Sequence, residues 1–260
     1  DPEEREMLEG VMRVADRPRL VPAPDIIGRL LRVKAPDELA LLQRAIDISD
    51  AAFEALEENL DPGMTELSAA EVFARNVKAA GGEDISFETI VAAGPNGAMP
   101  HARPTSEPVG ANRPIVIDMG AKIGGYCSAL TRTVVLGRPD EKFREIYDIV
   151  LEAQQTAIER VEAGMKANAA HQLAQDVIDR AGYGERFGHG RGHGVGLAVH
   201  EDPYLGKSGE DVLEEGMVFT IEPGIYLPGW GGVRIEDIVV LENGKARVLS
   251  KARKLTPAGV

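Results

Sequence analysis

A gapless internal repeat is the feature of this sequence that most restricts its fold. Residues 62–82 (PGMTELSAAEVFARNVKAAGG) align at a constant offset with residues 163–183 (AGMKANAAHQLAQDVIDRAGY). The matched positions include the turn and the stop of each copy: Gly63, Met64, Ala69, Ala80 and Gly81 fall on Gly164, Met165, Ala170, Ala181 and Gly182. Self-similarity of this kind indicates a duplication. Two similar halves would place a pocket at their junction, where binding sites commonly form.

Hydrophobic periodicity predicts helices followed by strands in each half. A first helix is expected from Asp37, which we expect to cap it, to about Asn59, with a second over Ser68–Ala80. The second half repeats this order, with helices over Glu141–Ala163 and Ala169–Ala181. Strands are expected in residues 87–94, 113–120, 121–137, 189–199, 216–222, 233–241 and 246–250. The sequence therefore predicts an α+β protein with two related halves.

Charge and cysteine content exclude several kinds of partner and bond. The formal charge of −13 opposes binding to nucleic acid or to an anionic membrane surface, since both carry negative charge. Cys127 is the only cysteine, so no disulfide can form within the chain. A reducing compartment is consistent with this composition, and we expect a cytoplasmic location.

A glycine-alternating stretch, GHGRGHGVGLAVHE at residues 188–201, carries three of the five histidines of the chain. So many glycines disfavour a helix. In an extended chain His189, Arg191 and His193 share one face, and the glycines leave the other face open to close approach. His200 follows shortly after. A merely polar loop is the plainer interpretation, but the concentration of histidines favours a site.

Three carboxylates stand in or beside apolar strands: Asp118, Glu222 and Glu236. A charged residue in such a place must be paired, bound to metal or turned to solvent. Together with His193 they predict a divalent metal site, and this ligand set suits manganese, cobalt, iron(II) or zinc. His101 lies in the turn-rich segment PNGAMPHARPT, for which an ordinary surface loop is an equal alternative.

These motifs together resemble the pita-bread metallopeptidases. PNGAMPHARPT, IDMGAKIGGYCSALTRTVVLG, GHGRGHGVGLAVHE, FTIEPGIY and VRIEDIVVL match most closely the branch of Xaa-Pro aminopeptidases and prolidases. The resemblance runs from about Leu30 nearly to the C-terminus. It implies a pita-bread fold, in which a pseudo-twofold repeat forms a curved antiparallel sheet flanked by helices. It also implies a metallopeptidase that cleaves before proline in a peptide substrate, with manganese as the expected ion.

The resemblance also implies roles for individual residues. Asp118, His193 and Glu222 would be metal ligands, Glu236 would bridge two ions, and Glu222 would act as general base. His200 would contact the substrate and stabilise the transition state. His101 and His189 would line the pocket, and His189 is a candidate donor of the proton to the leaving nitrogen. Arg234 would fix a ligand carboxylate.

One position departs from the family pattern GYxSDxTRT. Its aspartate, which bridges both metals in the family, is Ala129 here. We therefore expect at most one tightly held metal ion and a reduced rate by the two-metal route. Ala129 is either an inactivating substitution of the kind used to trap substrates or a natural divergence. The retention of the other four ligands favours a recent or introduced loss.

A second departure concerns the front of the chain. Residues 1–28 are rich in proline and charge and are expected to be a linker or the remnant of a missing N-terminal domain. Residues 29–260 are the expected catalytic domain, and the family implies a homodimer. Two alternative functions stay open: a metal-independent, creatinase-like hydrolase of C–N bonds, and a peptide-binding relative without activity.

Overall fold

A computed structural model describes residues 26–187 and 192–255. The predictions for His189 and Arg191 lie outside these ranges. The first described element, α2 (Ile26–Arg32), begins within the segment expected to be a linker. In the part of the chain that the structure describes, no helix is both long enough and apolar enough to cross a bilayer.

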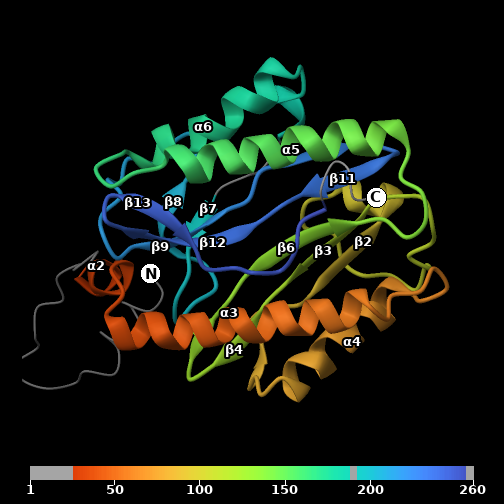
Figure 1. Ribbon diagram of the computed structural model, residues 1–260, viewed down its shortest axis with the longest axis horizontal. Coiled ribbons are helices and arrows are strands. Elements are labelled where there is room, and N and C mark those ends of the chain that lie inside the picture. The colour runs from red at the N-terminus through yellow and green to blue at the C-terminus, as the bar shows by residue number, and fades with distance from the viewer. Residues whose placement is uncertain (1–25, 188–191, 256–260) are drawn as a thin grey trace, which may run out of the picture.

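The first half consists of two helices and an antiparallel sheet. Helix α3 (Pro36–Glu57) packs against α4 (Glu66–Ala79), and both flank one side of the strands (Figure 1). The sheet has the order β2-β3-β6, formed by β2 (Ile90–Ala93), β3 (Ile115–Met119) and β6 (Leu130–Val134). Phe53 and Phe73 from the two helices are buried with Ile115 and Ile117 of β3.

The second half repeats this arrangement. Helix α5 (Glu141–Arg160) packs against α6 (Ala167–Arg180) on the opposite side of the molecule (Figure 1). Strands β7 (Gly192–Gly194), β9 (Val218–Ile221) and β12 (Asp237–Glu242) are adjacent in that order, as are β2, β3 and β6. β8 (Glu201–Leu205) and β13 (Lys245–Val248) extend this sheet at its two edges.

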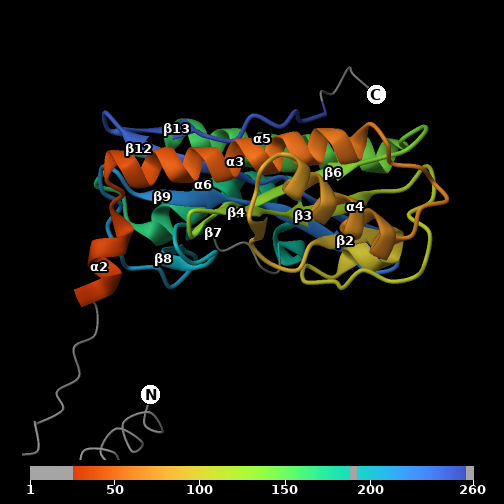
Figure 2. The same ribbon diagram turned by 90° about the horizontal axis from the view of Figure 1, so that it is seen from below.

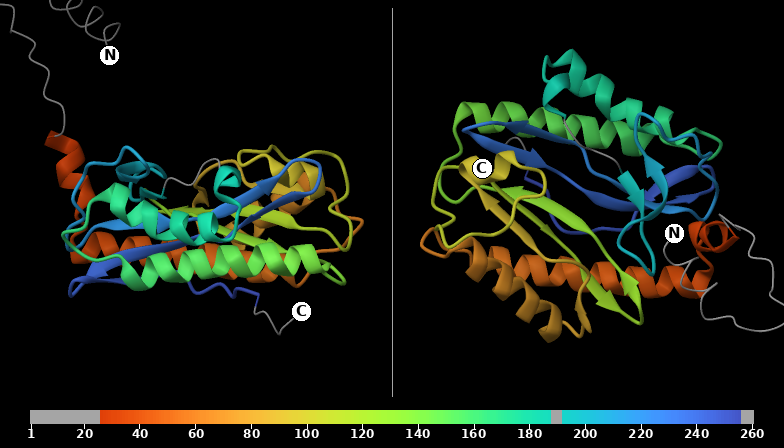
Figure 3. Two further views of the ribbon diagram at one scale, coloured as in Figure 1. Left: turned by 90° about the horizontal axis from the view of Figure 1, so that it is seen from above. Right: turned by 180° about the vertical axis from the view of Figure 1, so that it is seen from behind.

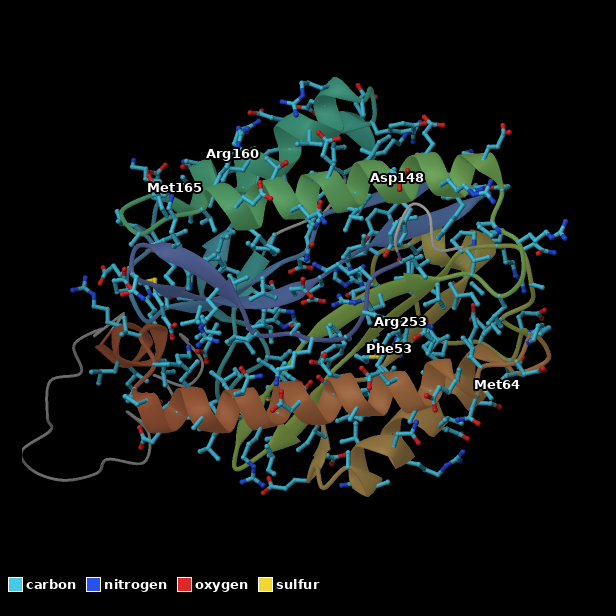
Figure 4. The ribbon with its side chains drawn as sticks, in the orientation of Figure 1. Phe53, Met64, Asp148, Arg160, Met165 and Arg253 are labelled. Carbon is cyan, nitrogen blue, oxygen red and sulfur yellow. The ribbon has the colours of Figure 1, made fainter. Side chains whose placement is uncertain are left out.

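The predicted internal repeat is visible in three dimensions. Helices α4 and α6 both contain 14 residues, and each ends before a glycine with positive φ, Gly81 and Gly182. Met64 and Met165, which the sequence repeat aligns, lie at opposite corners of the molecule (Figure 4). The fold class predicted from the sequence, α+β with two related halves, is confirmed.

The two sheets meet at one backbone contact. The Glu236 amide donates to the Thr131 carbonyl at 3.1 Å, which joins the start of β12 to β6. The helices cover this double sheet, as the side view shows (Figure 2). The remaining strands are short: β1 (Asp84–Ile85), β4 (Ala121–Ile123), β5 (Tyr126–Cys127), β10 (Gly224–Leu227) and β11 (Gly231–Arg234). The view from behind places β10 and β11 beside the first sheet (Figure 3).

Several details of the sequence prediction were wrong. Asp37 does not cap α3, because Pro36 already occupies the first turn and Ala35 is the capping residue. The Glu38 carboxylate instead accepts from the Ala35 amide at 2.8 Å. Residues 121–137 form three short strands rather than one, since Gly124 and Gly125 adopt positive φ and turn the chain. Residues 233–241 are likewise interrupted, by Ile235 and Glu236.

Candidate metal centre and active site

A cavity of about 120 Å³ lies where the two halves meet. Both halves contribute to its wall. The polar residues of its lining are His101, Asp118, His193, His200, Glu222, Arg234 and Glu236. Ala129 also lines the cavity. The sequence-predicted residues within the described ranges are therefore all gathered in one place, and His189 lies outside those ranges.

The second half supplies a compact group of ligand atoms. Among the described residues, His193, Glu222 and Glu236 each offer one ligand atom, and these atoms lie within 4.8 Å of one another. His193 belongs to β7, Glu222 directly follows β9, and Glu236 directly precedes β12. Three adjacent strands thus deliver one donor each to a single point. The imidazole Nε2 of His193 is 3.4 Å from Oε1 of Glu222.

The first half presents a different arrangement. Asp118 in β3 is paired with Arg234, whose Nη2 is 2.5 Å from its Oδ2. Ala129 directly precedes β6, as Glu236 directly precedes β12 in the other half. At corresponding positions, β12 therefore brings the carboxylate of Glu236 to the cavity, whereas β6 brings only the methyl group of Ala129. Ala129 is 3% exposed, so the methyl group is enclosed.

Two threonines hold the two glutamates. The Thr131 hydroxyl donates to Oε2 of Glu236 at 2.6 Å, and the Thr220 hydroxyl donates to Oε1 of Glu222 at 2.9 Å. Thr131 also accepts from Nε of Arg234 at 3.0 Å, and Thr220 accepts from the His193 amide at 3.0 Å. Each carboxylate is thereby oriented by a neighbour that is itself fixed, which is how metal ligands are commonly held.

Burial sets the protonation of the group. It raises the pKa of Glu222 to about 7. The pKa of Glu236 is raised well above its ordinary value by burial and by the charges of Glu222 and Asp118. Burial lowers the pKa of His193, so its ring is neutral at pH 7. Asp118, Glu222 and Glu236 share this cavity with Arg234, which forms an ion pair with Asp118.

These residues fit one divalent ion. The Nδ1 of His193 lies 3.0 Å from the Gly194 carbonyl, so Nδ1 donates and Nε2 presents a lone pair toward Glu222. Two facing acceptors at 3.4 Å require a proton or a cation between them. A neutral imidazole with two carboxylates is a donor set for the borderline divalent metals. In the first half, Asp118 is engaged by Arg234, and Ala129 has no ligand atom.

Two histidines lie at the outer part of the cavity. His200 is exposed and its ring is 4.3 Å from that of His193, centroid to centroid. Burial and the neighbouring His193 lower the pKa of His200. His101 is also exposed, and it lies near enough to Glu222 to lower the pKa of that carboxyl group. Both side chains can therefore reach a molecule bound above the metal ligands.

The sequence analysis missed several residues of the site. Phe87, Ile90 and Val199 form an apolar wall of the cavity. The Tyr226 hydroxyl oxygen accepts a hydrogen bond from Nη1 of Arg234 at 2.8 Å. Nothing in the apolar pattern distinguishes these residues from core residues. Thr131 stands in the motif TRT, so its neighbourhood was recognised but its bond to Glu236 was not.

Comparison with known proteins gives a consistent result. A family model described as metallopeptidase family M24 matches residues 40–243. A Xaa-Pro dipeptidase of Pyrococcus furiosus is 43% identical over 232 residues, which is 89% of this chain and 67% of the relative.

Solved structures agree in fold. A Xaa-Pro dipeptidase from Bacillus anthracis has a TM-score of 0.88 at 39% identity, covering 90% of this chain and 66% of that one. An X-Pro aminopeptidase from Thermotoga maritima has a TM-score of 0.88 at 37% identity, covering 91% and 67%. This chain thus spans about two thirds of the length of these relatives.

Proposed function

Because this chain belongs to metallopeptidase family M24 and has its pita-bread fold, we propose that it hydrolyses the peptide bond before proline. The observation that carries the proposal is the group formed by His193, Glu222 and Glu236 at the floor of the cavity. The names of the relatives, Xaa-Pro dipeptidase and X-Pro aminopeptidase, support proline-containing peptides as the substrate class.

We propose that the site holds one divalent ion, bound by these three residues, with manganese expected and cobalt, zinc or iron as alternatives. The pairing of Asp118 with Arg234 and the methyl group of Ala129 support a single ion. A carboxylate at position 129 would face the cavity at the start of β6, as Glu236 does at the start of β12. Its absence removes one anionic donor from the first half.

The residues of the cavity have distinct tasks in this reaction. A bound divalent ion supplies positive charge that acidifies water and polarises the substrate carbonyl. Glu222, with its pKa raised to about 7, takes the proton of the attacking water. His200 donates a hydrogen bond to the oxygen that gains charge on the attacked carbonyl. The C–O bond forms first and gives a tetrahedral intermediate, and the C–N bond to proline breaks once the proline nitrogen has received a proton.

The leaving proline nitrogen needs a proton. Glu222 can return the one that it took, and His189 is the second candidate donor. His101 lines the cavity and is proposed to contact the substrate. The nitrogen of an Xaa-Pro bond carries no hydrogen, so the pocket need not satisfy a donor there. The apolar side chains of Phe87, Ile90 and Val199 suit the aliphatic parts of such a substrate.

Hydrolysis assays test this function. Xaa-Pro dipeptides and tripeptides are incubated with manganese and either this chain or its Ala129→Asp form, with Xaa-Ala peptides as the matched control. The expected result is selective cleavage before proline that a chelator abolishes, with a gain of several orders of magnitude in the Ala129→Asp form. Chelator-resistant C–N hydrolysis would favour the creatinase-like alternative, and peptide binding by a folded, inert Ala129→Asp form would favour the binding module.

We also propose a cytoplasmic location and a homodimer. The single cysteine, Cys127, is buried and free, which suits a reducing compartment such as the cytoplasm. The homodimer is implied by the family, and sedimentation velocity tests it. Residues 29–260 are proposed to form one catalytic domain, and the ion pairs of Arg32 with Asp202 in β8 and with Asp211 support this.

A further inference from the structure

We propose that Lys34 is a positioning residue for His200. Lys34 forms a buried ion pair with Glu201, and this pair holds the loop of residues 195–200 against the cavity. The task of His200 in catalysis rests on the proposed function. The placement of its loop by Lys34 does not, and it can be measured without turnover.

Lys34 is fixed before it reaches Glu201. Its amide donates to the Gly216 carbonyl at 2.9 Å, and its Nζ donates to the Leu31 carbonyl at 2.6 Å. The same Nζ contacts Oε1 of Glu201. The side chains of Lys34 and Glu201 are only 2% and 9% exposed, so little water screens this pair.

Glu201 is folded back into the loop that it follows. Its Oε2 accepts from the Ala198 amide at 3.4 Å. A Cβ added to Gly196 would overlap the Glu201 carboxylate, so glycine at that position allows the carboxylate to lie inside the loop. The backbone of Glu201 is paired with Gly194, so both ends of the loop are held together. The carboxylate therefore supports the loop from within.

The supported loop carries His200 onto the metal centre. Its ring is 4.3 Å from the ring of His193, and both line the cavity. The far side of the loop is anchored where the Cys127 amide donates to the Gly196 carbonyl at 2.8 Å. His200 is exposed apart from its contact with the His193 ring, so the backbone of its loop contributes much of its placement.

A second ion pair works in the same direction. Arg32 of α2 donates to Asp202, directly after Glu201, at 2.7 Å and to Asp211 at 3.1 Å. Arg32 and Lys34 therefore hold two consecutive acidic residues that follow His200. The segment at the end of α2, far from the motifs in sequence, thus acts on the active site.

The energetics favour movement of the loop when Lys34 is lost. Removing one partner of a buried pair leaves the other charge unpaired in a medium that solvates it poorly. The Glu201 carboxylate would then turn toward water and draw residues 195–200 with it. The ion pair of Lys245 with Glu162, whose side chains are 61% and 53% exposed, lacks this property and serves as a control.

Nuclear magnetic resonance of the histidine rings tests the proposal. The chain has five histidines, and a His200→Gln variant assigns the His200 signal. The expected result is that Lys34→Met shifts this signal by more than its linewidth while His171, packed on Phe187, keeps its signal. Lys245→Met leaves both unchanged. An unchanged His200 signal in folded Lys34→Met overturns the proposal.

A second variant covers the case in which Lys34→Met does not fold. Glu201→Gln keeps the shape of the side chain and removes only its charge, and it is expected to shift the His200 signal in the same way. If folded Glu201→Gln leaves the His200 signal in place, the proposal is contradicted.

A double-mutant cycle in the Ala129→Asp form adds a functional readout. Lys34→Met is expected to lower kcat by about tenfold or more with a smaller change in KM, and to have little further effect once His200 is replaced by alanine. Equal losses with and without His200 would show that Lys34 acts independently of His200, which contradicts the proposal. If no form cleaves Xaa-Pro peptides, the proposed function fails and the ring signals still decide the role of Lys34.

Discussion

The guanidinium of Arg234 lies 2.5 Å from the carboxylate of Asp118, inside the cavity at the junction of the two halves. Arg234 comes from the second half of the chain and Asp118 from the first, so the pair spans the junction of the repeat. Arg234 is itself held by Thr131, by the hydroxyl of Tyr226 and by the Pro100 carbonyl. One of the expected ligands is therefore occupied by a cation that belongs to the protein.

Replacing Arg234 by methionine should destabilise the fold and free Asp118. Arg234 is 2% exposed, and loss of one partner from a buried pair costs about 3 kcal/mol in the free energy of unfolding. Urea denaturation measures this loss. Manganese should restore more stability to Arg234→Met than to Arg234→Met with Asp118→Asn. Equal restoration in the two variants would show that Asp118 does not bind the ion.

The two threonines that hold the glutamates are expected to tune metal affinity. Thr131→Val and Thr220→Val preserve shape but remove the hydroxyls that donate to Glu236 and Glu222. Loss of such a supporting hydrogen bond weakens metal binding by about 10- to 100-fold. Isothermal calorimetry with manganese measures the change. Thr89→Val, a buried threonine outside the cavity lining, is the matched control and should leave the affinity unchanged.

Asp50 makes a pH-dependent contribution to stability. Burial raises its pKa from 3.8 to about 6, although the Lys251 amide donates to its carboxylate and opposes the shift. Between these values the folded state keeps a proton that the unfolded chain has lost, so stability falls as the pH rises through this window. Above about pH 6, where Asp50 is ionised in the folded state too, its burial lowers the free energy of unfolding by about 3 kcal/mol.

Asp50→Asn removes this titration and provides the comparison. The stability of the variant relative to the original chain should increase from pH 4 to about pH 7, because Asp50 of the original chain becomes ionised in this window and asparagine does not. Chemical denaturation at several pH values gives the difference, in which the other carboxylates cancel. A difference that does not change across this window would contradict the raised pKa.

Most of the fold was predictable because its signals are local. The period of apolar residues located α3, α4, α5 and α6, and the constant offset of the repeat anticipated that α4 and α6 have the same length. The strand ends were less well placed, since Gly124 and Gly125 turn the chain within an apolar run. The cap of α3 differs from the prediction because Pro36 is already the first residue of the helix, which places Asp37 inside its first turn.

The cavity lining was predictable to the extent that its residues stand at strand ends. Asp118, Glu222 and Glu236 are charged residues in apolar surroundings, and such residues are conspicuous in a sequence. The resemblance implied that Arg234 fixes a ligand carboxylate, but it did not identify Asp118 as the partner. The pair Lys34–Glu201 was not predictable, because it joins residues that only the tertiary structure brings together. The same holds for Arg132 and Lys254, which both pair with the buried Asp237 behind the site.

The central claim is that this chain has a site for one divalent ion, because Ala129 provides no ligand atom to the first half of the cavity. Titration of manganese into the metal-free chain and into its Ala129→Asp form, followed by calorimetry, tests it most directly. The account predicts one tightly bound ion in this chain and two in the Ala129→Asp form. Two tightly bound ions in the chain as it stands, or none at all, would contradict it.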